Sequence, residues 1–482
     1  MICVTIAPVS RKLAKADLLN AARFGDIIEL QLDHLAKEPD VKDLVSASPK
    51  PLIISCRRKQ DGGAWQDSED ARLRLLRQAI AAGPAYVELD LDIAPSIPRF
   101  GETQRIIAFT RIDRPEDDID SVFSEAATHH ADVVKFTWPT PTMDDAWPLL
   151  RAVSGKRRLP IVGIGLGRAD LTFSLLGRKY GTPWIYAALE RGMETYPGQA
   201  TVFELDETYR WRDIDRETIF VGIAGFGRAQ EITTRIMNAG MREIGKNVRC
   251  LPIEVGEVRK LKPMLDALKI RALVIANRLS RRLLPLADAF RDDAGTIDLL
   301  RKKRDNLWYG SSALTAGAVH LLGAHCSSSG ADATLKNRNI LILGAGGAAA
   351  GLARACVAQQ GLVSVTAPRD ADAQAIATEL DCRFVPLHNV YATLVDVAVV
   401  ADPELKCGAL KGNLNPSLFK SGMTVVDCSD PPVEHALFEE ARSRGCGLID
   451  PAHVFAEQIA RQFYSITGLA LPPSAIASGL AE

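Results

Sequence analysis

The sequence lacks the features that would assign it to a disulfide-rich, zinc-binding or membrane-spanning class. Its nine cysteines are odd in number, are scattered along the chain and contain no C-x-x-C pair, which argues against a disulfide or zinc framework. No apolar run approaches the ~18 residues of a membrane span. The N-terminus also lacks the basic and long apolar regions of a signal peptide. We therefore expect reduced thiols in a soluble, cytoplasmic protein.

An excess of charge of either sign is also absent. The 58 basic and 59 acidic residues leave a net charge of −1, so electrostatics give no reason to expect nucleic acid or an anionic membrane as the main partner. The eight histidines form no convincing metal set. A small-molecule substrate is the expected partner, and the sequence leaves a homodimer open. With 482 residues the chain is long enough for two or three domains of ~150 residues.

The first 190 residues contain a series of short, apolar, β-branched runs. Most of these runs read as strands that are covered on both faces. Several connecting segments are amphipathic helices, whereas 93–104 is a poor helix. This alternation predicts a (β/α)8 TIM barrel, in which chemistry takes place at the C-terminal ends of the strands. The eight runs are 2–7, 26–33, 51–57, 85–92, 105–111, 131–138, 160–167 and 184–189.

A lysine interrupts the sixth of these runs. Alternation places Val133, Lys135 and Thr137 of ADVVKFTW on one face, which in a barrel is the interior. Burial of an ammonium group is costly and favours the neutral amine, which is a nucleophile toward a ketone. The alternative is a structural lysine that pairs with a carboxylate at a strand end. Position alone leaves these two interpretations open.

Further polar side chains follow the second and third runs. Glu29, Gln31 and Asp33 share one side of the second run. Arg57 ends the third run, and Asp61 follows it in the sequence KQDGG. Inward carboxylates at these positions would balance the charges of Lys135 and Arg57. The alternative is a solvated network of ion pairs at the barrel mouth.

Five segments together resemble the type I 3-dehydroquinate dehydratases over roughly residues 1–212. They are IELQLDHL, ISCRRKQDGG, ADVVKFTW, LGRADLTFSLLGRKYG and YPGQ. The resemblance implies a (β/α)8 barrel that forms a lysine Schiff base with the C3 ketone of 3-dehydroquinate and eliminates water. It makes Lys135 the catalytic lysine. It also implies that substrate is bound by Thr5, Glu29, Gln31, Arg57, Asp61 and Gln199.

Several positions depart from the pattern of that family. The stretch AFTRIDRP (108–115) has no histidine where the family has its general acid/base. Gln31 and Ser174 replace two arginines, Leu166 replaces a methionine, and Asp61 replaces a glutamate. Loss of a positioned acid/base typically lowers a rate by about 10²–10⁴. Three arginines near strand ends either replace the missing cations or are ordinary surface residues: Arg111, Arg114 and Arg168.

In the second half, the segment 339–361 combines a strand, a glycine-rich turn and an alanine-rich helix. The glycines allow close backbone approach, and the helix N-terminus offers N–H groups to a pyrophosphate. We therefore predict a cofactor-binding turn at Gly344, Ala345, Gly346, Gly347 and Ala348. Arg369 follows the next strand and favours a 2′-phosphate, hence NADP. A solvent-facing turn arginine is the alternative.

Residues 214–482 resemble shikimate dehydrogenase. The resemblance implies a two-part α/β region: a substrate domain over 214–330, completed by 450–482, and a Rossmann-type NADP-binding domain over 336–449. Gln458 matches the C-terminal substrate glutamine of that family. The order of dehydratase and then dehydrogenase is that of bifunctional proteins of the shikimate pathway, which supplies aromatic amino acid biosynthesis.

The dehydrogenase-like half departs further from its family. Ser280 stands at the catalytic lysine, Asp298 at an asparagine, and WYGSSALTAG (308–317) lacks the catalytic aspartate. Without that proton-transferring pair, shikimate dehydrogenase chemistry should be severely impaired, although cofactor binding can persist. Three hypotheses follow: a lysine-dependent dehydratase, a pseudoenzyme that binds ligand or NADP, and a lyase with an altered substrate.

Overall fold

The computed structural model describes residues 1–290, 295–328, 335–402, 405, 413–428 and 436–480. The chain divides into two compact units. One comprises Met1–Ile219 with Leu251–Lys260, and the other comprises Phe220–Cys250 with Leu261–Glu482. The eight cysteines in the described part of the chain are free thiols. Within those same residues, no helix is long and apolar enough to cross a membrane.

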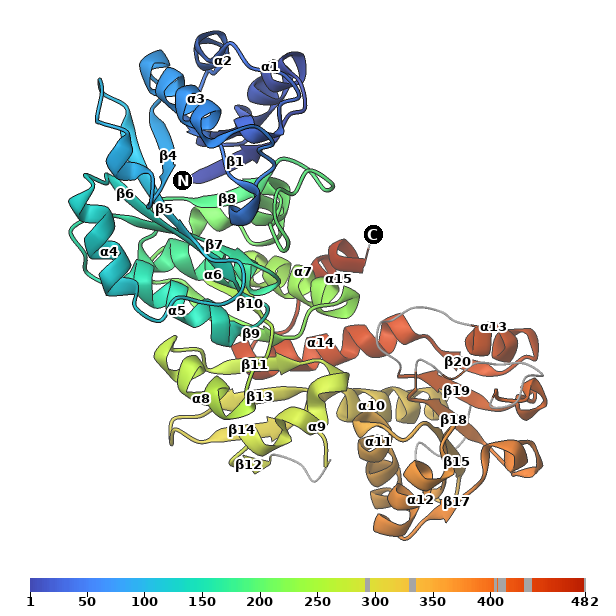
Figure 1. Cartoon of the computed structure of the whole chain (residues 1–482). Helices are drawn as coiled ribbons and strands as arrows, with labels where there is room; N and C mark the ends of the chain where they lie inside the picture. The colour runs from blue at the N-terminus through green and yellow to red at the C-terminus, as the bar shows by residue number, and fades with distance from the viewer. Residues whose placement is uncertain (291–294, 329–334, 403–404, 406–412, 429–435, 481–482) are drawn as a thin grey trace. The chain divides into compact units, whose positions relative to one another are not determined.

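The first unit is built around eight parallel strands (Figure 1). Hydrogen-bonded neighbours follow the order β7-β6-β5-β4-β3-β2-β1-β8, and the end strands β7 and β8 contact each other, so the ring is nearly closed. The predicted barrel is therefore confirmed. The strands are β1 (Ile2–Ile6), β2 (Ile27–Gln31), β3 (Leu52–Ser55), β4 (Tyr86–Asp90), β5 (Gln104–Thr110), β6 (Val133–Pro139), β7 (Ile161–Leu166) and β8 (Ile185–Ala188).

Helices connect most of these strands. They are α1 (Arg11–Ala21), α2 (Val41–Ala47), α3 (Glu69–Ala82), α4 (Ile119–Thr128), α5 (Met143–Ser154) and α6 (Ala169–Tyr180). The connector 93–104 contains no α-helix, as its sequence predicted, but only the short 3-10 turn Ala94–Ser96 before β5 begins at Gln104.

Seven of the eight strands are shorter than predicted, and the ends of two of them, β2 and β3, bear on the site. β2 ends at Gln31, before a 3-10 turn that carries Asp33, and β3 ends at Ser55. The Asp33 carboxylate accepts the backbone N–H groups of Arg57 at 3.1 Å and Ala64 at 2.8 Å. These hydrogen bonds hold Arg57 in a loop rather than in the strand. The direction of its side chain therefore does not follow the alternation of side chains along β3.

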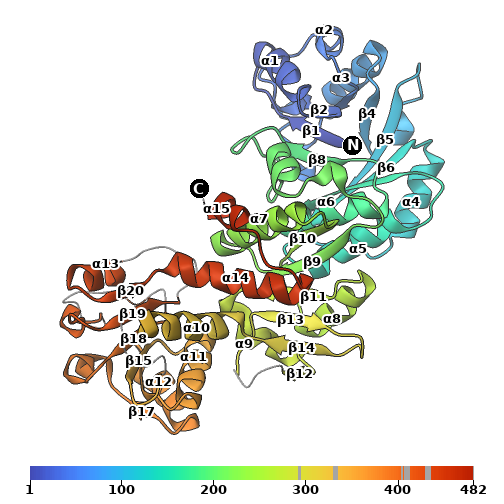
Figure 2. The same ribbon diagram turned by 180° about the vertical axis from the view of Figure 1, so that it is seen from behind.

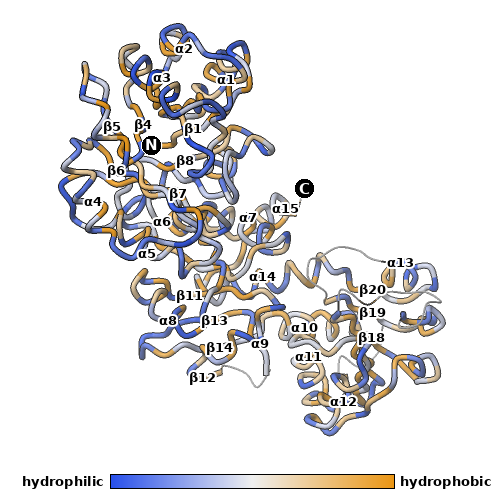
Figure 3. The backbone as a smooth tube through the Cα atoms, in the orientation of Figure 1, coloured by the Kyte–Doolittle hydropathy of each residue, from blue (hydrophilic) through white to orange (hydrophobic). Residues whose placement is uncertain are grey.

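The interior of the barrel is layered. An apolar layer contains Cys3, Ile27, Ile53, Ile106, Val133 and Trp184, each buried. Two residues further along five of the strands stand Thr5, Glu29, Ser55, Ala108 and Lys135. Because side chains alternate between the faces of a strand, this second set also faces the interior. Figure 3 shows the mainly hydrophobic strands enclosed by helices of mixed hydropathy. The barrel interior thus places polar groups in a layer directly next to a layer of buried apolar side chains.

A buried carboxylate joins the end of β7 to the start of α6. Asp170 accepts the backbone N–H of Gly165 at 2.7 Å and the hydroxyl of Tyr196 at 3.2 Å. Burial raises the pKa of Asp170 to about 7, and these two hydrogen bonds only partly oppose that shift. The folded state therefore holds the proton more tightly than the unfolded chain, in which an aspartate titrates near pH 3.9.

Replacement of Asp170 by asparagine is expected to stabilise the barrel more at pH 8 than at pH 5. Between pH 4 and 7 the folded state binds more protons than the unfolded state, so the free energy of unfolding falls as pH rises. An amide side chain cannot ionise and avoids this loss, which amounts to about 1–4 kcal/mol above pH 7. Urea unfolding at both pH values measures the difference. The exposed control Asp117→Asn should show none, and an equal effect at both pH values would contradict the argument.

The second unit contains most of a mixed six-stranded sheet with the order β10-β9-β11-β13-β14-β12, and part of β10 belongs to the segment Leu251–Lys260 of the first unit. Its strands are β9 (Ile219–Ala224), β10 (Val248–Ile253), β11 (Ala272–Ile275), β12 (Ala289–Phe290), β13 (Leu299–Lys302) and β14 (Trp308–Ser311). Helices of this region are α7 (Arg228–Glu243), α8 (Val258–Ala267), α9 (Ser280–Leu283), α14 (Pro451–Thr467) and α15 (Pro473–Leu480).

The second unit also contains a parallel six-stranded sheet with the order β17-β16-β15-β18-β19-β20. This is the 3-2-1-4-5-6 order of a Rossmann fold, so that prediction is confirmed. Its strands are β15 (Asn339–Leu343), β16 (Leu362–Thr366), β17 (Arg383–Phe384), β18 (Val397–Val400), β19 (Thr424–Asp427) and β20 (Gly447–Ile449). Its helices are α11 (Gly347–Ala358), α12 (Asp370–Glu379) and α13 (Ala436–Ser443). Nearby, α10 (Ala313–Ser328) packs beside α14 (Figure 2).

Candidate active site

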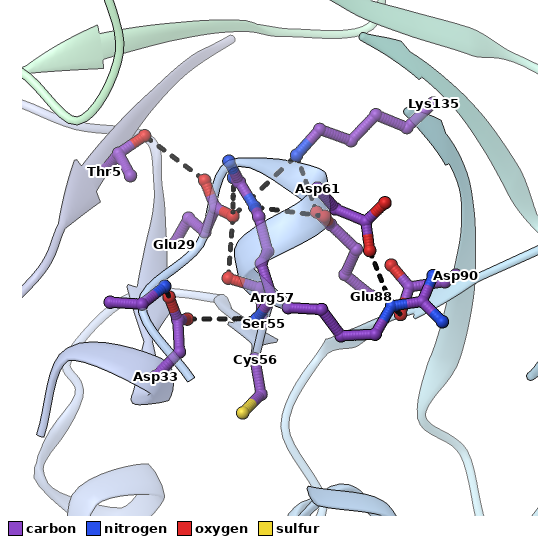
Figure 4. A network of polar contacts seen from close by, with 12 residues as sticks. Thr5, Glu29, Asp33, Ser55, Cys56, Arg57, Asp61, Glu88, Asp90 and Lys135 are labelled. Carbon is purple, nitrogen blue, oxygen red and sulfur yellow. Dashed lines mark hydrogen bonds and ion pairs between the residues drawn. The ribbon is translucent and has the colours of Figure 1, made fainter. Parts of the chain in front are cut away.

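Lys135 lies on β6 and points into the barrel (Figure 4). Only 1% of the residue is exposed. Its Nζ lies 2.6 Å from Oε2 of Glu88 and 3.8 Å from Oε1 of Glu29. The same nitrogen is 4.5 Å from the centre of the Tyr186 ring. The structure therefore combines both interpretations of this residue, because the amine is buried in the interior and also paired with a carboxylate.

Glu29 is held as an anion. It accepts hydrogen bonds from Ser55 at 2.8 Å, Arg57 at 2.7 Å and Thr5 at 3.3 Å. Complete burial alone would raise the pKa of Glu29, but the positive charges of Lys135 and Arg57 and these hydrogen bonds lower it to about 2. A carboxylate with so low a pKa is a weak proton acceptor near neutral pH. Glu29 is therefore suited to balancing charge and to positioning.

Glu88 is the carboxylate in closest contact with the lysine. One of its oxygens binds Lys135, and the other lies 3.4 Å from Nε of Arg57. Arg57 thus connects Glu29 with Glu88 across the interior. Sequence reasoning missed Glu88, although Glu88 and Asp90 of β4, and Asp92 just after it, alternate with apolar residues as the polar residues of β2 do. That alternation was the available signal.

Asp61 belongs to an outer group of ion pairs. Arg58 donates to Asp61 at 2.6 Å and to Asp92 at 2.7 Å. Asp90 lies 2.8 Å from Arg72, but burial still raises the pKa of Asp90 to about 6 because it outweighs the nearby arginines. The predicted carboxylates therefore separate into Glu29, which reaches Lys135, and Asp61, which pairs with Arg58 instead.

A glycine turn brings Gln199 to the barrel interior. Gly198 adopts φ +86°, and a Cβ there would stand 2.0 Å from the carbonyl oxygen of Gly167, so only glycine fits. The turn allows Nε2 of Gln199 to donate to the hydroxyl of Thr5 at 3.4 Å. Nε2 of Gln31 is buried and has no hydrogen-bond partner among the described residues. It is therefore available to a ligand.

The region of the missing histidine supplies no substitute base beside the lysine. Arg111 pairs with Glu116 at 3.0 Å, and Arg168 is largely exposed and lies 3.5 Å from Glu254. Arg114 is exposed. Ser174 and Leu166 carry no charge, although the family has an arginine at the former position. Among the described residues, the titratable groups that form ion pairs with Lys135 are Glu29 and Glu88.

In the second unit, the glycine-rich turn follows β15. Gly344 adopts φ +134°, and Gly346 immediately precedes α11 without a side chain that caps the helix. A Cβ on Gly346 would meet no atom within 4 Å, whereas one on Gly347 would lie 3.2 Å from Oγ1 of Thr296. Ala345 lies in the turn, and Ala348 lies in the first turn of α11. The helix N-terminus is thus open on one side, and its donors fit a dinucleotide pyrophosphate.

Arg369 lies just beyond β16, at the place where a 2′-phosphate is recognised in Rossmann folds. Its side chain is 85% exposed and lies 2.8 Å from Asp372, three residues further along the chain. An exposed pair of this kind is weak, so the guanidinium is free to exchange its partner for a phosphate.

The positions of the missing dehydrogenase groups have structural roles. Oγ of Ser280 lies 2.6 Å from Oγ1 of Thr296 and accepts the N–H of Ile297 at 2.9 Å. Asp298 accepts the N–H groups of Ala313 and Leu314, at 2.9 and 2.7 Å, where α10 begins. A serine used in this way cannot replace a proton-transferring lysine. Within the part of the chain that the structure describes, no group of three His, Cys, Asp or Glu residues could hold a metal ion.

Gln458, the predicted substrate glutamine of this half, lies on α14. Its Nε2 donates to Oδ2 of Asp298 at 3.2 Å. Four positions further on, Nε2 of Gln462 donates to the backbone carbonyl of Asp298 at 3.2 Å. Both glutamines line a pocket of the second unit.

Comparison with known proteins supports the two resemblances. Residues 2–216 match the sequence model of the family described as Type I 3-dehydroquinase. A chloroplastic bifunctional 3-dehydroquinate dehydratase/shikimate dehydrogenase of Arabidopsis thaliana is 22% identical, and the match covers 98% of this chain and 83% of that protein. A 3-dehydroquinate dehydratase of Methanococcus maripaludis is 28% identical, and the match covers 43% of this chain and 97% of that protein. The predicted similarity to bifunctional proteins of this kind is confirmed.

Solved structures are similar to this chain at low sequence identity. A dehydroquinate dehydratase and shikimate dehydrogenase from S. pombe is 15% identical, with a TM-score of 0.45, and the match covers 100% of this chain and 98% of that chain. A shikimate dehydrogenase from Aquifex aeolicus is 22% identical, with a TM-score of 0.48, and the match covers 56% of this chain and 100% of that chain.

Proposed function

We propose, from the premise that residues 2–216 form a type I 3-dehydroquinase domain, that the barrel dehydrates 3-dehydroquinate to 3-dehydroshikimate in the shikimate pathway. The assignment covers residues 1–212 and makes Lys135 the Schiff-base residue. One observation carries it: Nζ of Lys135 is buried in the barrel interior, 2.6 Å from a carboxylate that can accept its proton.

The first step requires a neutral amine. Oε2 of Glu88 accepts a proton from the ammonium group of Lys135, and the freed lone pair adds to the C3 carbonyl carbon of the substrate. Loss of the carbonyl oxygen as water gives an iminium ion. Glu29 and Arg57 remain paired during this step, at 2.7 Å, and keep the total charge of the site balanced.

The second step is the elimination. The iminium at C3 acidifies the C2 proton, whose removal gives an enamine, and the C1 hydroxyl then leaves as water after it gains a proton. Hydrolysis of the resulting imine releases the product and restores Lys135. We assign these proton transfers to Glu88, because residues 108–115 contain no histidine and Glu29 is too weak a base.

The remaining barrel residues are assigned to substrate binding. Thr5, Gln31 and Gln199 offer hydroxyl and amide groups to the substrate hydroxyls, and the buried Nε2 of Gln31 is the one without a protein partner among the described residues. Arg57 offers positive charge to the substrate carboxylate. Asp61 acts through Arg58, to which it is bound.

A turnover assay tests the proposed function. Addition of 3-dehydroquinate to the purified chain should produce the ultraviolet absorbance of the conjugated enone of 3-dehydroshikimate. Because the usual histidine is missing, we expect a rate about 10²–10⁴ below that of an enzyme with a positioned acid/base. Absence of any enone over the uncatalysed background would contradict the proposal.

The second half is proposed to bind an NAD(P) dinucleotide at Gly344–Ala348, with NADP preferred through Arg369. This assigns cofactor binding to 336–449 and substrate binding to 214–330 with 450–482. The bound nicotinamide would supply or accept a hydride. Because Ser280 is engaged with Thr296 and Ile297 and offers no proton, we expect severely impaired oxidation of NADPH with 3-dehydroshikimate.

Titration with NADPH, followed by nucleotide fluorescence, tests the cofactor assignment. The variant Arg369→Ala should bind NADPH about tenfold more weakly and NADH unchanged, since a charge-assisted contact with the 2′-phosphate contributes about 1.5–3 kcal/mol. The matched control is Arg338→Ala, which changes a residue just before β15, at the opposite end of the parallel strands, and should bind NADPH normally. Equal losses for both nucleotides would refute the 2′-phosphate role.

A further inference from the structure

The loop that follows β8 and leads to Gln199 is attached to the barrel through a single buried side chain. Between Glu190 and Gly198, Tyr196 is buried and Thr195 is half-buried, whereas the other residues are exposed. The Tyr196 ring belongs to the apolar cluster of the barrel interior. Among the described residues, the hydrogen bonds of 190–194 stay within the loop itself. The position of the loop therefore depends strongly on Tyr196.

Asp170 receives the hydroxyl of this tyrosine. The Tyr196 hydroxyl donates to Oδ2 of Asp170 at 3.2 Å, and the N–H of Gly165 donates to Oδ1 at 2.7 Å. Burial, together with the nearby Asp170, raises the pKa of Tyr196 well above its usual value, so the hydroxyl keeps its proton and acts as a donor. A second link is close by, because the N–H of Gly167 donates to the carbonyl of Pro197 at 2.7 Å. The carboxylate thus connects the loop to the end of β7.

The attached loop sets the direction of the Gln199 amide. Oε1 of Gln199 accepts the backbone N–H of Thr195 at 2.8 Å, and a backbone N–H can only donate. Nε2 is therefore the end that faces the interior, where it donates to the hydroxyl of Thr5 at 3.4 Å. That hydroxyl in turn donates to Glu29 at 3.3 Å. Because the bond from Gln199 to Thr5 is long, the amide can donate to a substrate oxygen instead.

We infer that Tyr196 and Asp170 are positioning residues of the proposed dehydratase, since their hydrogen bond holds the loop so that Nε2 of Gln199 faces the substrate. The inference rests on the proposed function of the barrel and adds two residues to it. Neither residue forms an ion pair or a hydrogen bond with Lys135. Because Gln199 is assigned to substrate binding and not to proton transfer, loss of the bond should raise KM and leave kcat nearly unchanged.

Steady-state kinetics of enone formation by Tyr196→Phe test the inference. Phenylalanine keeps the ring in the apolar cluster and removes only the hydroxyl. KM should rise about three- to tenfold, the effect of one lost hydrogen bond, and kcat should stay within about twofold of wild type. The matched control is Tyr180→Phe, at the other end of α6, which should change neither parameter. An unchanged KM in Tyr196→Phe would overturn the inference alone, whereas a wild-type chain that forms no enone would overturn the proposed function.

A double-mutant cycle separates positioning of Gln199 from a general effect on the fold. If Tyr196 acts through Gln199, the double variant Tyr196→Phe/Gln199→Ala should have the same KM as Gln199→Ala. Two independent effects would instead multiply. Multiplied effects in the double variant would therefore contradict the positioning role.

The conservative variant of the carboxylate supplies a further comparison. Asp170→Asn keeps an acceptor for Gly165 and a hydrogen-bonding group for Tyr196, so KM should stay within about twofold of wild type. Asp170→Ala removes both and should raise KM as Tyr196→Phe does. If Asp170→Asn raises KM as much as Tyr196→Phe, the hydrogen bond is not what positions the loop, and the inference is wrong.

Discussion

Replacement of Lys135 by methionine is expected to abolish dehydration of 3-dehydroquinate, with a loss of at least about 10⁴ in turnover. Methionine has a similar length and fills the same interior space, but it has no nitrogen to form the iminium. Removal of a covalent nucleophile typically costs several orders of magnitude, because the remaining groups act only together with it. The measurement is the rate of enone formation. The exposed Lys59→Met variant is the matched control and should retain full activity.

The same substitution has a structural cost that needs its own control. Without Lys135, the buried Glu88 keeps only Arg57 at 3.4 Å, and an uncompensated buried charge destabilises by about 3–5 kcal/mol. The double variant Lys135→Met/Glu88→Gln removes both charges and should recover most of the lost stability in urea unfolding. It should remain inactive. Retention of more than about 1% of the activity in a folded Lys135→Met variant would contradict covalent catalysis at this residue.

The second large effect is expected for Glu88→Gln. An amide keeps the size and one hydrogen bond of the carboxylate but cannot accept the lysine proton, so kcat should fall by about 10²–10⁴ while KM changes little. In contrast, Glu29→Gln should act mainly on KM, because Glu29 is held by Ser55 and Arg57 and is a weak base with a pKa of about 2.

Steady-state kinetics distinguish the two carboxylates. Glu102→Gln, an exposed change before β5, serves as the matched control and should leave both kinetic parameters within about twofold of wild type. If Glu88→Gln retains the wild-type kcat, another group must carry the proton. That result would leave Glu88 with a purely structural role as the ion-pair partner of Lys135.

The barrel and the Rossmann sheet could be predicted from the sequence because their strands are short, apolar and β-branched. The interior position of Lys135 also followed from alternation within β6. The ends of β2 and β3 were predicted too far along the chain, because the hydrogen bonds that the backbone N–H groups of Arg57 and Ala64 donate to Asp33 are not visible in a local pattern. Such long-range contacts decide where a strand stops.

The partner of the lysine could not be predicted for a similar reason. Lys135 and Glu88 are 47 positions apart and meet only because β4, β5 and β6 are adjacent in the ring. Local alternation showed that carboxylates face the interior, but it did not show which one lies opposite the amine. Likewise, the sequence placed Asp298 at a substituted position, whereas its hold on Gln458 and Gln462 required the three-dimensional arrangement of α14.

The central claim is that Lys135 forms a covalent bond with the substrate, and borohydride trapping tests it most directly. The chain is incubated with 3-dehydroquinate and sodium borohydride, digested and analysed by mass spectrometry. The account predicts a reduced adduct on the peptide that contains Lys135, and no adduct on the Lys135→Met variant. Turnover without any adduct, or an adduct confined to another lysine, would contradict it.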